Sequence, residues 1–232
     1  MSSIINNKPL FISFEGGEGV GKSTQIRLLA DRLTKAGYEV CCLREPGGTT
    51  IGEQVRDILL DTSNTALAPI AELLLFEAAR AQLVTEVIKP ALAEGKVVLV
   101  DRFTDSTLAY QAFARGLDVA LVNTANIIGS CALVPTRTVL LQKDVDEGLL
   151  KATEEGADRL ESEGREFHVR VHEGFMRLAK EHYDRIAIVT CQELKEDTHE
   201  GVFAAVADLF NEQAAEPYIV SEELLQKIKD DK

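Results

Sequence analysis

The chain has 232 residues, and 38 acidic residues against 25 lysine and arginine residues give it a formal net charge of −13. This acidic excess argues against broad binding of nucleic acids, because their phosphates need a basic protein face. Hydrophobic residues make up 45% of the chain, yet no stretch approaches the ~18 unbroken apolar residues of a membrane-spanning helix. We therefore expect one globular domain over residues 1–212, with neither a nucleic-acid nor a membrane partner.

The first eight residues, MSSIINNK, lack the charged-then-apolar pattern of a signal peptide, which predicts a short loose arm on a cytoplasmic protein. The four cysteines, Cys41, Cys42, Cys131 and Cys191, do not have the spacing of metal ligands, and three of them fall in apolar strand-like runs. We expect buried, reduced thiols.

Five apolar runs rich in β-forming residues alternate with segments of helical period. Alternation of this kind predicts an α/β fold, with parallel strands joined by right-handed crossovers and helices on both faces of the sheet. The predicted strands are Leu10–Phe14, Glu39–Leu43, Lys96–Val100, Thr138–Leu141 and Ile186–Thr190.

The segment from Pro69 to Glu94 is rich in alanine and leucine, and Gly95 marks its end. Its apolar spacing predicts one long core helix, with a buried face that includes Leu74, Leu75, Ala78 and Ala79.

From Lys143 to Arg165 the sequence is charged and poor in apolar residues, which predicts a mobile, exposed lid at about residues 151–165. Residues 213–232 form a carboxyl-terminal extension in which Ser221 can cap a short helix. Such a terminal helix is more often docked or frayed than used to bind a partner.

The pattern Gly16-x-x-x-x-Gly21-Lys22-Ser23 fits a phosphate-binding loop, and it lies between a predicted strand and a predicted helix, as that motif requires. Its glycines let backbone N–H groups close around phosphate oxygens, whereas a plain glycine-rich turn would not need the Lys-Ser pair. We expect this loop to bind ATP through Gly16, Gly17, Glu18, Gly19, Val20, Gly21, Lys22, Ser23 and Thr24.

A second element of the phosphate site is the apolar run Lys96–Val100, which ends in Asp101-Arg102. An acid at the carboxyl end of a central strand lies beside the loop, so Asp101 and the Ser23 hydroxyl are the expected ligands of Mg²⁺. The neighbouring guanidinium of Arg102 suits a second phosphate.

Switch GTPases, motor ATPases and nucleotide kinases all use such a loop. A GTPase should carry Asn-Lys-x-Asp after a later strand, but the strand at Thr138–Leu141 leads into Gln142-Lys143-Asp144-Val145. A motor ATPase usually needs a longer chain, so the length favours a small kinase.

Four motifs then follow one another: FEGGEGVGKST at 14–24, REPGGT at 44–49, LLLFEAARAQ at 73–82, and Asp101-Arg102-Phe103 with Ser106-Thr107 and Ala109-Tyr110-Gln111. In this order they resemble the bacterial thymidylate kinase family, over about residues 9–212. The resemblance implies a five-stranded nucleoside-monophosphate-kinase fold, phosphoryl transfer from Mg-ATP to dTMP, and a homodimer.

The resemblance also implies roles at matching positions. Phe76, which would otherwise be a core aromatic, is expected to stack on thymine, with Arg80 one helical turn later at a thymine carbonyl. Arg102 is expected to hold the dTMP phosphate, and the bulk of Tyr110 to disfavour a ribose. The other expected substrate contacts are Arg44, Ser106, Thr107, Gln111 and Asp158, while Arg115 is either a further contact or a surface charge.

One departure from the family pattern concerns catalysis, for which Lys22, Arg102, Glu18 and Arg159 are the expected residues. An unpaired acid among phosphate-binding amides is unfavourable, so Glu18 needs a partner, either Arg102 or the sugar 3′-hydroxyl. Family members with an acid here usually supply an arginine from the lid, but residues 151–161 are acidic and lack Arg-x-Arg before Gly156.

Arg159 is the expected replacement, with Arg165 or Lys151 as the other options. Gln142 also departs from the Leu-Asp that usually ends the fourth strand, and Phe103 from a commoner tyrosine. The altered lid leaves two alternatives open: a nucleotide-binding regulator that has lost phosphoryl transfer, and a kinase of another small acceptor.

Overall fold

The computed structural model describes residues 9–153 and 158–210, so the predicted amino-terminal arm, the centre of the predicted lid and the predicted carboxyl-terminal extension lie outside the described residues. The helices and strands, in chain order, are β1 (Leu10–Glu15), α1 (Lys22–Lys35), β2 (Val40–Arg44), α2 (Thr50–Leu60), α3 (Pro69–Leu83), η1 (Val84–Ile88), α4 (Lys89–Ala93), β3 (Val97–Asp101), α5 (Thr104–Thr107), η2 (Leu108–Ala114), α6 (Val119–Gly129), β4 (Arg137–Gln142), α7 (Val145–Thr153), α8 (Arg165–Glu181), β5 (Ile186–Thr190), α9 (Lys195–Val206) and η3 (Ala207–Phe210).

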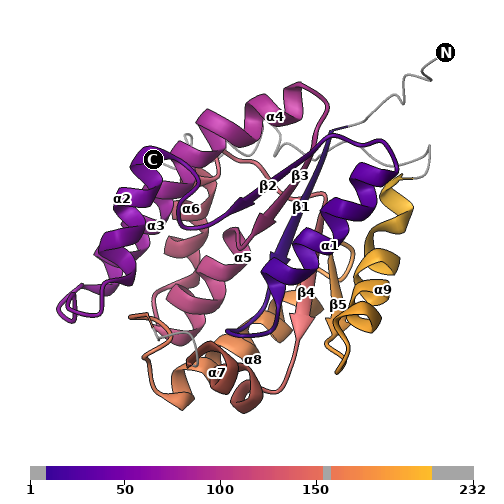
Figure 1. The fold of residues 1–232 in the computed structure, drawn as a ribbon. Coiled ribbons are helices and arrows are strands. Elements are labelled where there is room, and N and C mark those ends of the chain that lie inside the picture. The colour runs from indigo at the N-terminus through magenta and orange to yellow at the C-terminus, as the bar shows by residue number, and fades with distance from the viewer. Residues whose placement is uncertain (1–8, 154–157, 211–232) are drawn as a thin grey trace.

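The five strands form one parallel sheet in the order β2-β3-β1-β4-β5, which confirms the predicted α/β fold (Figure 1). Each strand lies within one residue of its predicted position at either end. The order reverses at β1, with β3 on one side and β4 on the other. Loops that leave the carboxyl ends of β1 and β3 therefore meet at this switch point, where open α/β sheets bind their ligands.

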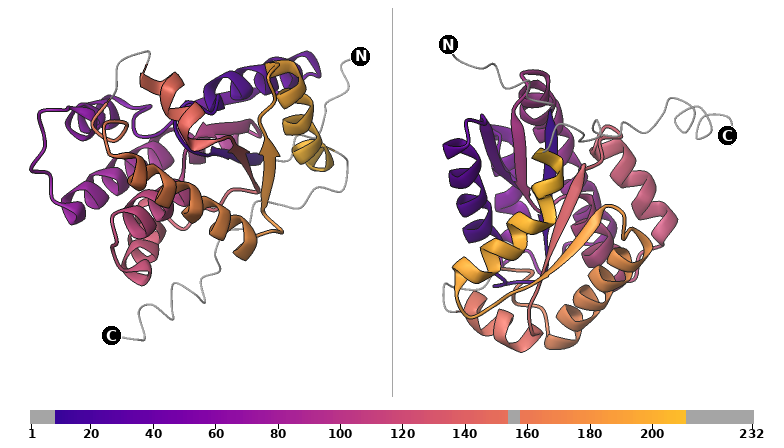
Figure 2. Two further views of the ribbon diagram at one scale, coloured as in Figure 1. Left: turned by 90° about the horizontal axis from the view of Figure 1, so that it is seen from below. Right: turned by 90° about the vertical axis from the view of Figure 1, so that its right-hand side faces the viewer.

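Helices cover both faces of the sheet, as Figures 1 and 2 show. The side chains of β1 alternate between the two faces, as strand geometry requires. Leu10, Ile12 and Phe14 pack with residues of α1 and α9, whereas Phe11 packs with η1 and α4 on the other face. Burial on both faces explains why β1 is a nearly continuous apolar run.

The long helix expected from Pro69 to Glu94 is present as α3, η1 and α4 in succession, but its expected buried face is only partly right: Ala79 is buried and Leu75 is half-buried. Leu74 is 59% exposed and Ala78 is also exposed, whereas Glu72 and Arg80 are 1% and 2% exposed. The inner face of α3 carries charged groups beside buried apolar ones, whereas Leu74 and Ala78 lie on the surface. The buried residues are Glu72, Leu73, Glu77, Ala79, Arg80 and Leu83. Hydrophobic periodicity assigned Leu74 and Ala78 to the core because it takes into account only the hydrophobicity of each residue.

The charged segment that follows β4 begins with a helix, α7, where the sequence indicated an exposed mobile segment. Gly148 of this helix is buried against the phosphate-binding loop, since a Cβ built on it would lie 2.5 Å from the Glu18 carbonyl oxygen. The residues just before the predicted lid are thus packed on the phosphate-binding loop.

The cysteines are free thiols, as expected, but none is buried: Cys42 is exposed and the other three are half-buried. β2 is an edge strand, so the side chains of Cys41 and Cys42 are less covered than those of central strands. Within residues 9–153 and 158–210, every helix is too short or too polar to cross a membrane.

Candidate active site

The phosphate-binding loop connects β1 to α1, and two of its glycines are required by their surroundings. Gly16 has φ +138°, and a Cβ there would lie 2.5 Å from the Leu141 carbonyl oxygen. Gly19 has φ +63°, and a Cβ there would collide with the backbone of Gly148. A side chain at either position would be strained and would push the loop out of place. The absence of side chains at these two glycines thus allows the loop to pack closely, as well as leaving its backbone open to a phosphate.

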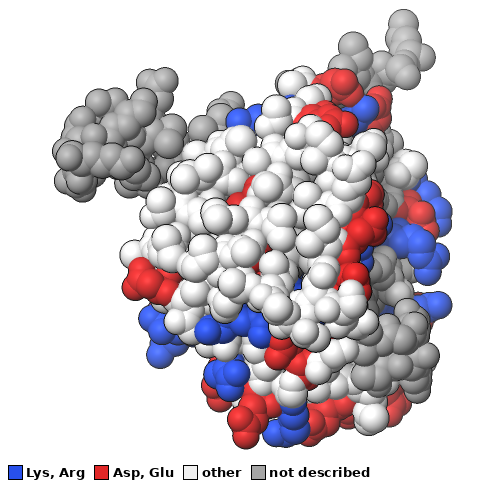
Figure 3. Space-filling view, turned by 90° about the vertical axis from the view of Figure 1, so that its left-hand side faces the viewer, with Lys and Arg blue, Asp and Glu red and all other residues white. Residues whose placement is uncertain are grey.

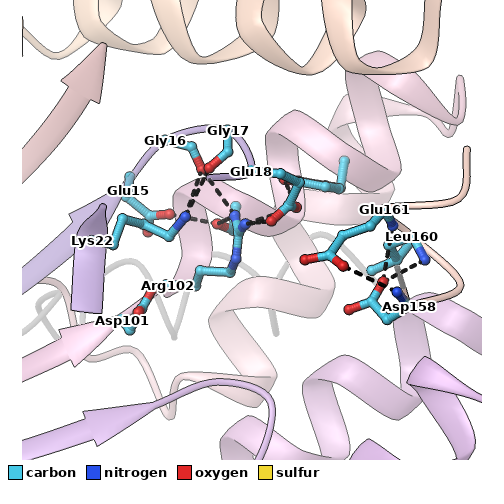
Figure 4. Close-up of polar contacts among 12 residues, drawn as sticks. Glu15, Gly16, Gly17, Glu18, Lys22, Asp101, Arg102, Asp158, Leu160 and Glu161 are labelled. Atoms are coloured by element: carbon cyan, nitrogen blue, oxygen red, sulfur yellow. Dashed lines mark hydrogen bonds and ion pairs between the residues drawn. The ribbon is translucent and has the colours of Figure 1, made fainter. Parts of the chain in front are cut away.

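Lys22 folds back over the loop at the start of α1. Its Nζ donates hydrogen bonds to the carbonyl oxygens of Gly17 at 2.8 Å and Gly16 at 3.3 Å (Figure 4). The side chain is buried, and burial together with the nearby Arg102 charge lowers its pKa. A buried ammonium held only by neutral carbonyls favours an incoming anion, which fits the expected phosphate role.

Ser23 and Asp101 lie together, as predicted, because β1 and β3 are neighbours. The Ser23 hydroxyl donates to Asp101 Oδ2 at 2.7 Å. One carboxylate and one hydroxyl beside a phosphate site suit Mg²⁺, which keeps several waters and binds through few protein ligands. No group of three or more histidine, cysteine or acidic side chains that could hold a metal occurs in the described part of the chain. The donor set therefore fits a phosphate-bound Mg²⁺ rather than a protein-caged ion.

Arg102 is the centre of the site and has an unusual backbone conformation, with φ +69°. Its N–H donates to the Phe14 carbonyl oxygen at 2.9 Å, which anchors the turn to β1. One terminal nitrogen, NH2, lies 2.8 Å from both carboxylate oxygens of Glu18, and the other, NH1, donates to the Gly16 carbonyl oxygen at 3.1 Å. A left-handed conformation at a non-glycine residue is costly and is typical of functional sites.

Glu18 therefore has one of its two expected partners, Arg102, and the Tyr110 hydroxyl donates to it as well, at 2.5 Å. Burial raises the pKa of Glu18, but Arg102, Lys22 and the Tyr110 hydroxyl outweigh it and hold the pKa at about 2. Burial likewise raises the pKa of Tyr110, so its hydroxyl stays protonated and remains a donor. The acid and the arginine form a neutral pair beneath the loop.

A second acid, Glu15, lies fully buried at the end of β1. It accepts hydrogen bonds from the Phe103 N–H at 2.8 Å and the Ser106 hydroxyl at 2.5 Å. Burial and the nearby Asp105 raise its pKa to about 8. The Ser106 hydroxyl is thus committed to Glu15, and its oxygen also accepts from Arg102 at 3.3 Å. These bonds fix the turn that carries Arg102.

A single cleft of about 610 Å³ connects the loop with the side chains expected to hold the acceptor. Figure 4 shows Lys22, Arg102 and Glu18 in a row, with Asp158 and Glu161 farther along on the side of Glu18 away from Lys22. The predicted site residues that line the cleft are Glu18, Gly19, Gly21, Lys22, Ser23, Thr24, Arg44, Phe76, Arg80, Asp101, Arg102, Ser106, Thr107, Tyr110, Gln111 and Asp158. Gly16, Gly17 and Val20 lie in the same loop but do not line the cleft.

At the acceptor end, α3 presents Phe76 and Arg80 to the cleft, one turn apart. The Arg80 guanidinium donates to Glu45 Oε2 at 2.8 Å, to Glu77 Oε1 at 2.5 Å and to Asn126 Oδ1 at 2.9 Å. Burial raises the pKa of Glu45 to about 7, although Arg80 opposes this. Three partners fix the guanidinium in one orientation beside Phe76.

Arg44 is half-exposed, and its guanidinium lies 3.0 Å from Glu53 Oε2. Arg56 also lines the cleft and donates to the Pro46 carbonyl oxygen at 3.0 Å, yet sequence reasoning missed it. Its signal was a basic residue four residues after the buried Gly52, and so on the same face of α2. Arg56 places a further positive charge at this end.

The lid cations are not all where the sequence suggested. Arg159 does not line the cleft: its Nε donates to the Leu59 carbonyl oxygen at 2.7 Å, and its NH2 lies 2.6 Å from Glu72 Oε2. Arg165 is exposed and pairs with Asp146 at 2.6 Å. Of the three options, Lys151 on α7 lines the cleft beside the loop. The catalytic role expected for Arg159 has no support from its position.

The chain was then compared with known proteins. The family model described as thymidylate kinase matches residues 14–202. A thymidylate kinase of Geotalea uraniireducens is 47% identical over 203 residues, which cover 84% of this chain and 95% of that protein. A thymidylate kinase of Trichlorobacter lovleyi is 49% identical over 187 residues, covering 78% of this chain and 88% of that protein.

Among solved structures, the crystal structure of thymidylate kinase from Ehrlichia chaffeensis superposes with a TM-score of 0.71 at 32% identity. The match covers 86% of this chain and 98% of that one. The family model covers most of the chain and the sequence and structural matches agree with it, so the chain belongs to the thymidylate kinase family.

Proposed function

We propose that this protein transfers the γ-phosphoryl group of ATP to dTMP, giving ADP and dTDP. The observation that carries the proposal is the single cleft that connects Lys22 to the pocket of Phe76 and Arg80, with Arg102 between them. An anion-binding loop and an aromatic pocket flanked by a fixed guanidinium match a nucleotide triphosphate donor and a nucleobase-bearing acceptor. Membership of the thymidylate kinase family identifies the acceptor as thymidylate.

In this mechanism the protein aligns two phosphates and neutralises their charge, because phosphoryl transfer asks for little else. Lys22 binds the outer phosphates of ATP in exchange for its bonds to the Gly16 and Gly17 carbonyl oxygens. Arg102 binds the dTMP phosphate while Glu18 holds its other side. The attacking phosphate oxygen is already anionic, so a strong general base is unnecessary. Tyr110 fills the space next to the sugar.

Ser23 and Asp101 are the residues that would hold Mg²⁺, since their oxygens already lie 2.7 Å apart beside the loop. When bound there with ATP, Mg²⁺ supplies a Lewis acid that withdraws charge from the phosphates. We include it in the proposal because the hydroxyl and carboxylate are hard oxygen donors of the kind that it prefers.

The lid cation in this proposal is Lys151. Gly148, three residues earlier on the same helix face, packs on the loop at Gly19, so α7 already lies against the phosphate site. Lys151 is exposed, lines the cleft and has the length to reach a bound phosphate. A lid at residues 151–165 within a kinase domain over residues 1–212 is part of the same proposal.

A homodimer is also proposed, on the basis of the apolar surface over α2 and α3. Figure 3 shows a broad face of the molecule with few charged side chains, and α2 packs on α3 and α3 on α6. Apolar patches of this kind usually mark protein interfaces. The exposed apolar residues of these three helices are Ile51, Ile58, Ile70, Leu74, Val119, Leu121 and Ile128.

The test is an assay of ADP release coupled to NADH oxidation, run with dTMP, dUMP, dCMP, dGMP and AMP as separate acceptors. We expect turnover with dTMP that depends on Mg²⁺. Tight calorimetric binding of ATP and dTMP without ADP release would favour the regulator that has lost transfer. Turnover with another monophosphate and none with dTMP would favour the kinase of a different acceptor.

A further inference from the structure

Glu72 lies in the first turn of α3, is 1% exposed, and is contacted by side chains from three parts of the chain. Gln111 of η2 donates its Nε2 to Glu72 Oε1 at 3.0 Å. Arg115 donates to both carboxylate oxygens, at 3.1 and 3.2 Å. Arg159, from the predicted lid, lies 2.6 Å from Oε2. The carboxylate is therefore held by hydrogen bonds from Gln111 and Arg115 and by an ion pair with Arg159.

The charge state of Glu72 decides how the Gln111 amide is oriented. Burial raises the pKa of Glu72, but Arg115, Gln111 and Arg159 outweigh it, and the pKa lies below its ordinary value. An ionised carboxylate accepts hydrogen bonds and cannot donate them. The Gln111 side chain must then turn its NH₂ group toward Glu72, because the opposite orientation would place its carbonyl oxygen against the carboxylate.

This orientation leaves the Gln111 carbonyl oxygen, Oε1, as the group that remains for a ligand. Gln111 is 2% exposed, and it lines the cleft together with Phe76 and Thr107. A fixed acceptor in a pocket favours a base with a ring N–H and opposes one whose ring nitrogen carries a lone pair. Thymine and uracil have N3–H, whereas cytosine has a lone pair at N3.

We propose that Glu72 is a positioning residue that locks the Gln111 amide and thereby makes the pocket select a 3-NH pyrimidine over cytosine; the inference rests on the proposed function. Arg115 and Arg159 serve the lock by keeping Glu72 charged. Arg159 thus has a place in acceptor recognition, which links the predicted lid to the base pocket. The selection comes from a side chain that does not line the cleft.

Glu72→Gln tests the lock, since a glutamine can both donate and accept and lets the Gln111 amide flip. The readout is the ratio of kcat/KM for dTMP to kcat/KM for dCMP, which we expect to fall about ten- to hundredfold. A purely structural role would lower both values together and leave the ratio unchanged. The matched control is Glu163→Gln, which removes a carboxylate 2.5 Å from Arg115 without touching Gln111 and should keep the ratio.

A double-mutant cycle with Gln111→Met completes the test, because Glu72 acts on selection only through Gln111. The double variant should have the ratio of Gln111→Met alone. An unchanged ratio in Glu72→Gln, or additive losses in the double variant, would overturn the inference. If Glu72→Gln does not fold, Gln111→Met is measured alone. An unchanged ratio of kcat/KM values in Gln111→Met would also overturn the inference.

The preference for dTMP over dCMP is also measured without turnover, as the ratio of the two Kd values obtained by calorimetry. A wild-type protein that binds dTMP over dCMP but releases no ADP would refute the proposed transfer and leave the lock standing. A wild-type protein that phosphorylates dTMP, with a ratio unaffected by Glu72→Gln, would refute the lock and leave the proposed function standing.

Discussion

Replacing Glu18 by glutamine removes the negative charge between Arg102 and Tyr110 while keeping the shape of the side chain. The carboxylate is buried, with 12% of its side chain exposed, and its two oxygens each lie 2.8 Å from Arg102 NH2. Glutamine keeps one of those acceptors and leaves the buried guanidinium without its counter-charge. We expect the variant to be less stable at neutral pH, because an uncompensated buried charge is costly.

The size of the effect follows from the pKa of Glu18. Lowering it from an ordinary 4.5 to about 2 corresponds to about 3 kcal/mol of stability that the ionised form contributes. Because the folded-state pKa lies below the unfolded one, this stabilisation is complete above about pH 4.5 and is lost as the pH falls toward 2. The difference in free energy of unfolding between wild type and Glu18→Gln should follow that course.

The measurement is urea unfolding of both proteins at several pH values from 7 downward, with the difference taken at each pH so that other acids cancel. The control is Glu193→Gln, which removes an exposed acid and should change stability by less than ~0.5 kcal/mol at every pH. A difference that is below ~1 kcal/mol at pH 7, or that does not shrink in acid, would refute the assignment of Glu18 as the ionised partner of Arg102.

Four further predictions concern the same molecule. Lys22→Ala should lower kcat more than about a hundredfold with Tm unchanged, and near-normal ADP release would refute its role. Burial and the nearby Asp105 raise the pKa of Glu15 to about 8, so the free energy of unfolding of wild type should fall as the pH rises from 4.5 through 8. Glu15→Gln should lack this fall, and an equal fall in both proteins would contradict the buried, protonated Glu15. Lys151→Ala should lower kcat at least about tenfold and Arg165→Ala should not; equal kcat values contradict the lid proposal. Leu74→Arg should yield a monomer in analytical ultracentrifugation, and an unchanged dimer would exclude this face.

The strands of the parallel sheet and the position of the phosphate site could be predicted because local signals carry them. A strand buried on both faces is a continuous apolar run, as in Leu10–Glu15, and a loop that must lie close to other backbone needs glycine at Gly16 and Gly19. Strand neighbours in a parallel α/β sheet then bring Asp101 to Ser23. Each step uses residues that are close in sequence or a topology rule.

The partners of the buried charges could not be predicted in this way. Glu72 and Arg159 are far apart in the sequence, and only the folded chain shows that their opposite charges meet. Periodicity assigned Leu74 to the core for the same reason, because it cannot see that Arg80 is neutralised by Glu45 and Glu77 and so can be buried instead. Hydrophobicity predicts burial poorly where arginine and glutamate cancel one another.

These pairs also explain how a chain with an excess of acid can bind two polyanionic nucleotides. Arg102, Arg80 and Arg159 each pair with an acid of this chain, so their guanidinium groups are held in fixed orientations. Fixing a side chain with many rotamers in advance removes the entropic cost of ordering it from binding and from the transition state. NH1 of Arg102 is held more weakly than NH2, at 3.1 and 3.3 Å from neutral oxygens, whereas NH2 faces the Glu18 carboxylate. Under the proposed function, NH1 is therefore the nitrogen that we propose for the acceptor phosphate. In this proposal the acids hold the cations in position, and the weakly held NH1 of Arg102 exchanges neutral oxygens for the reacting phosphate.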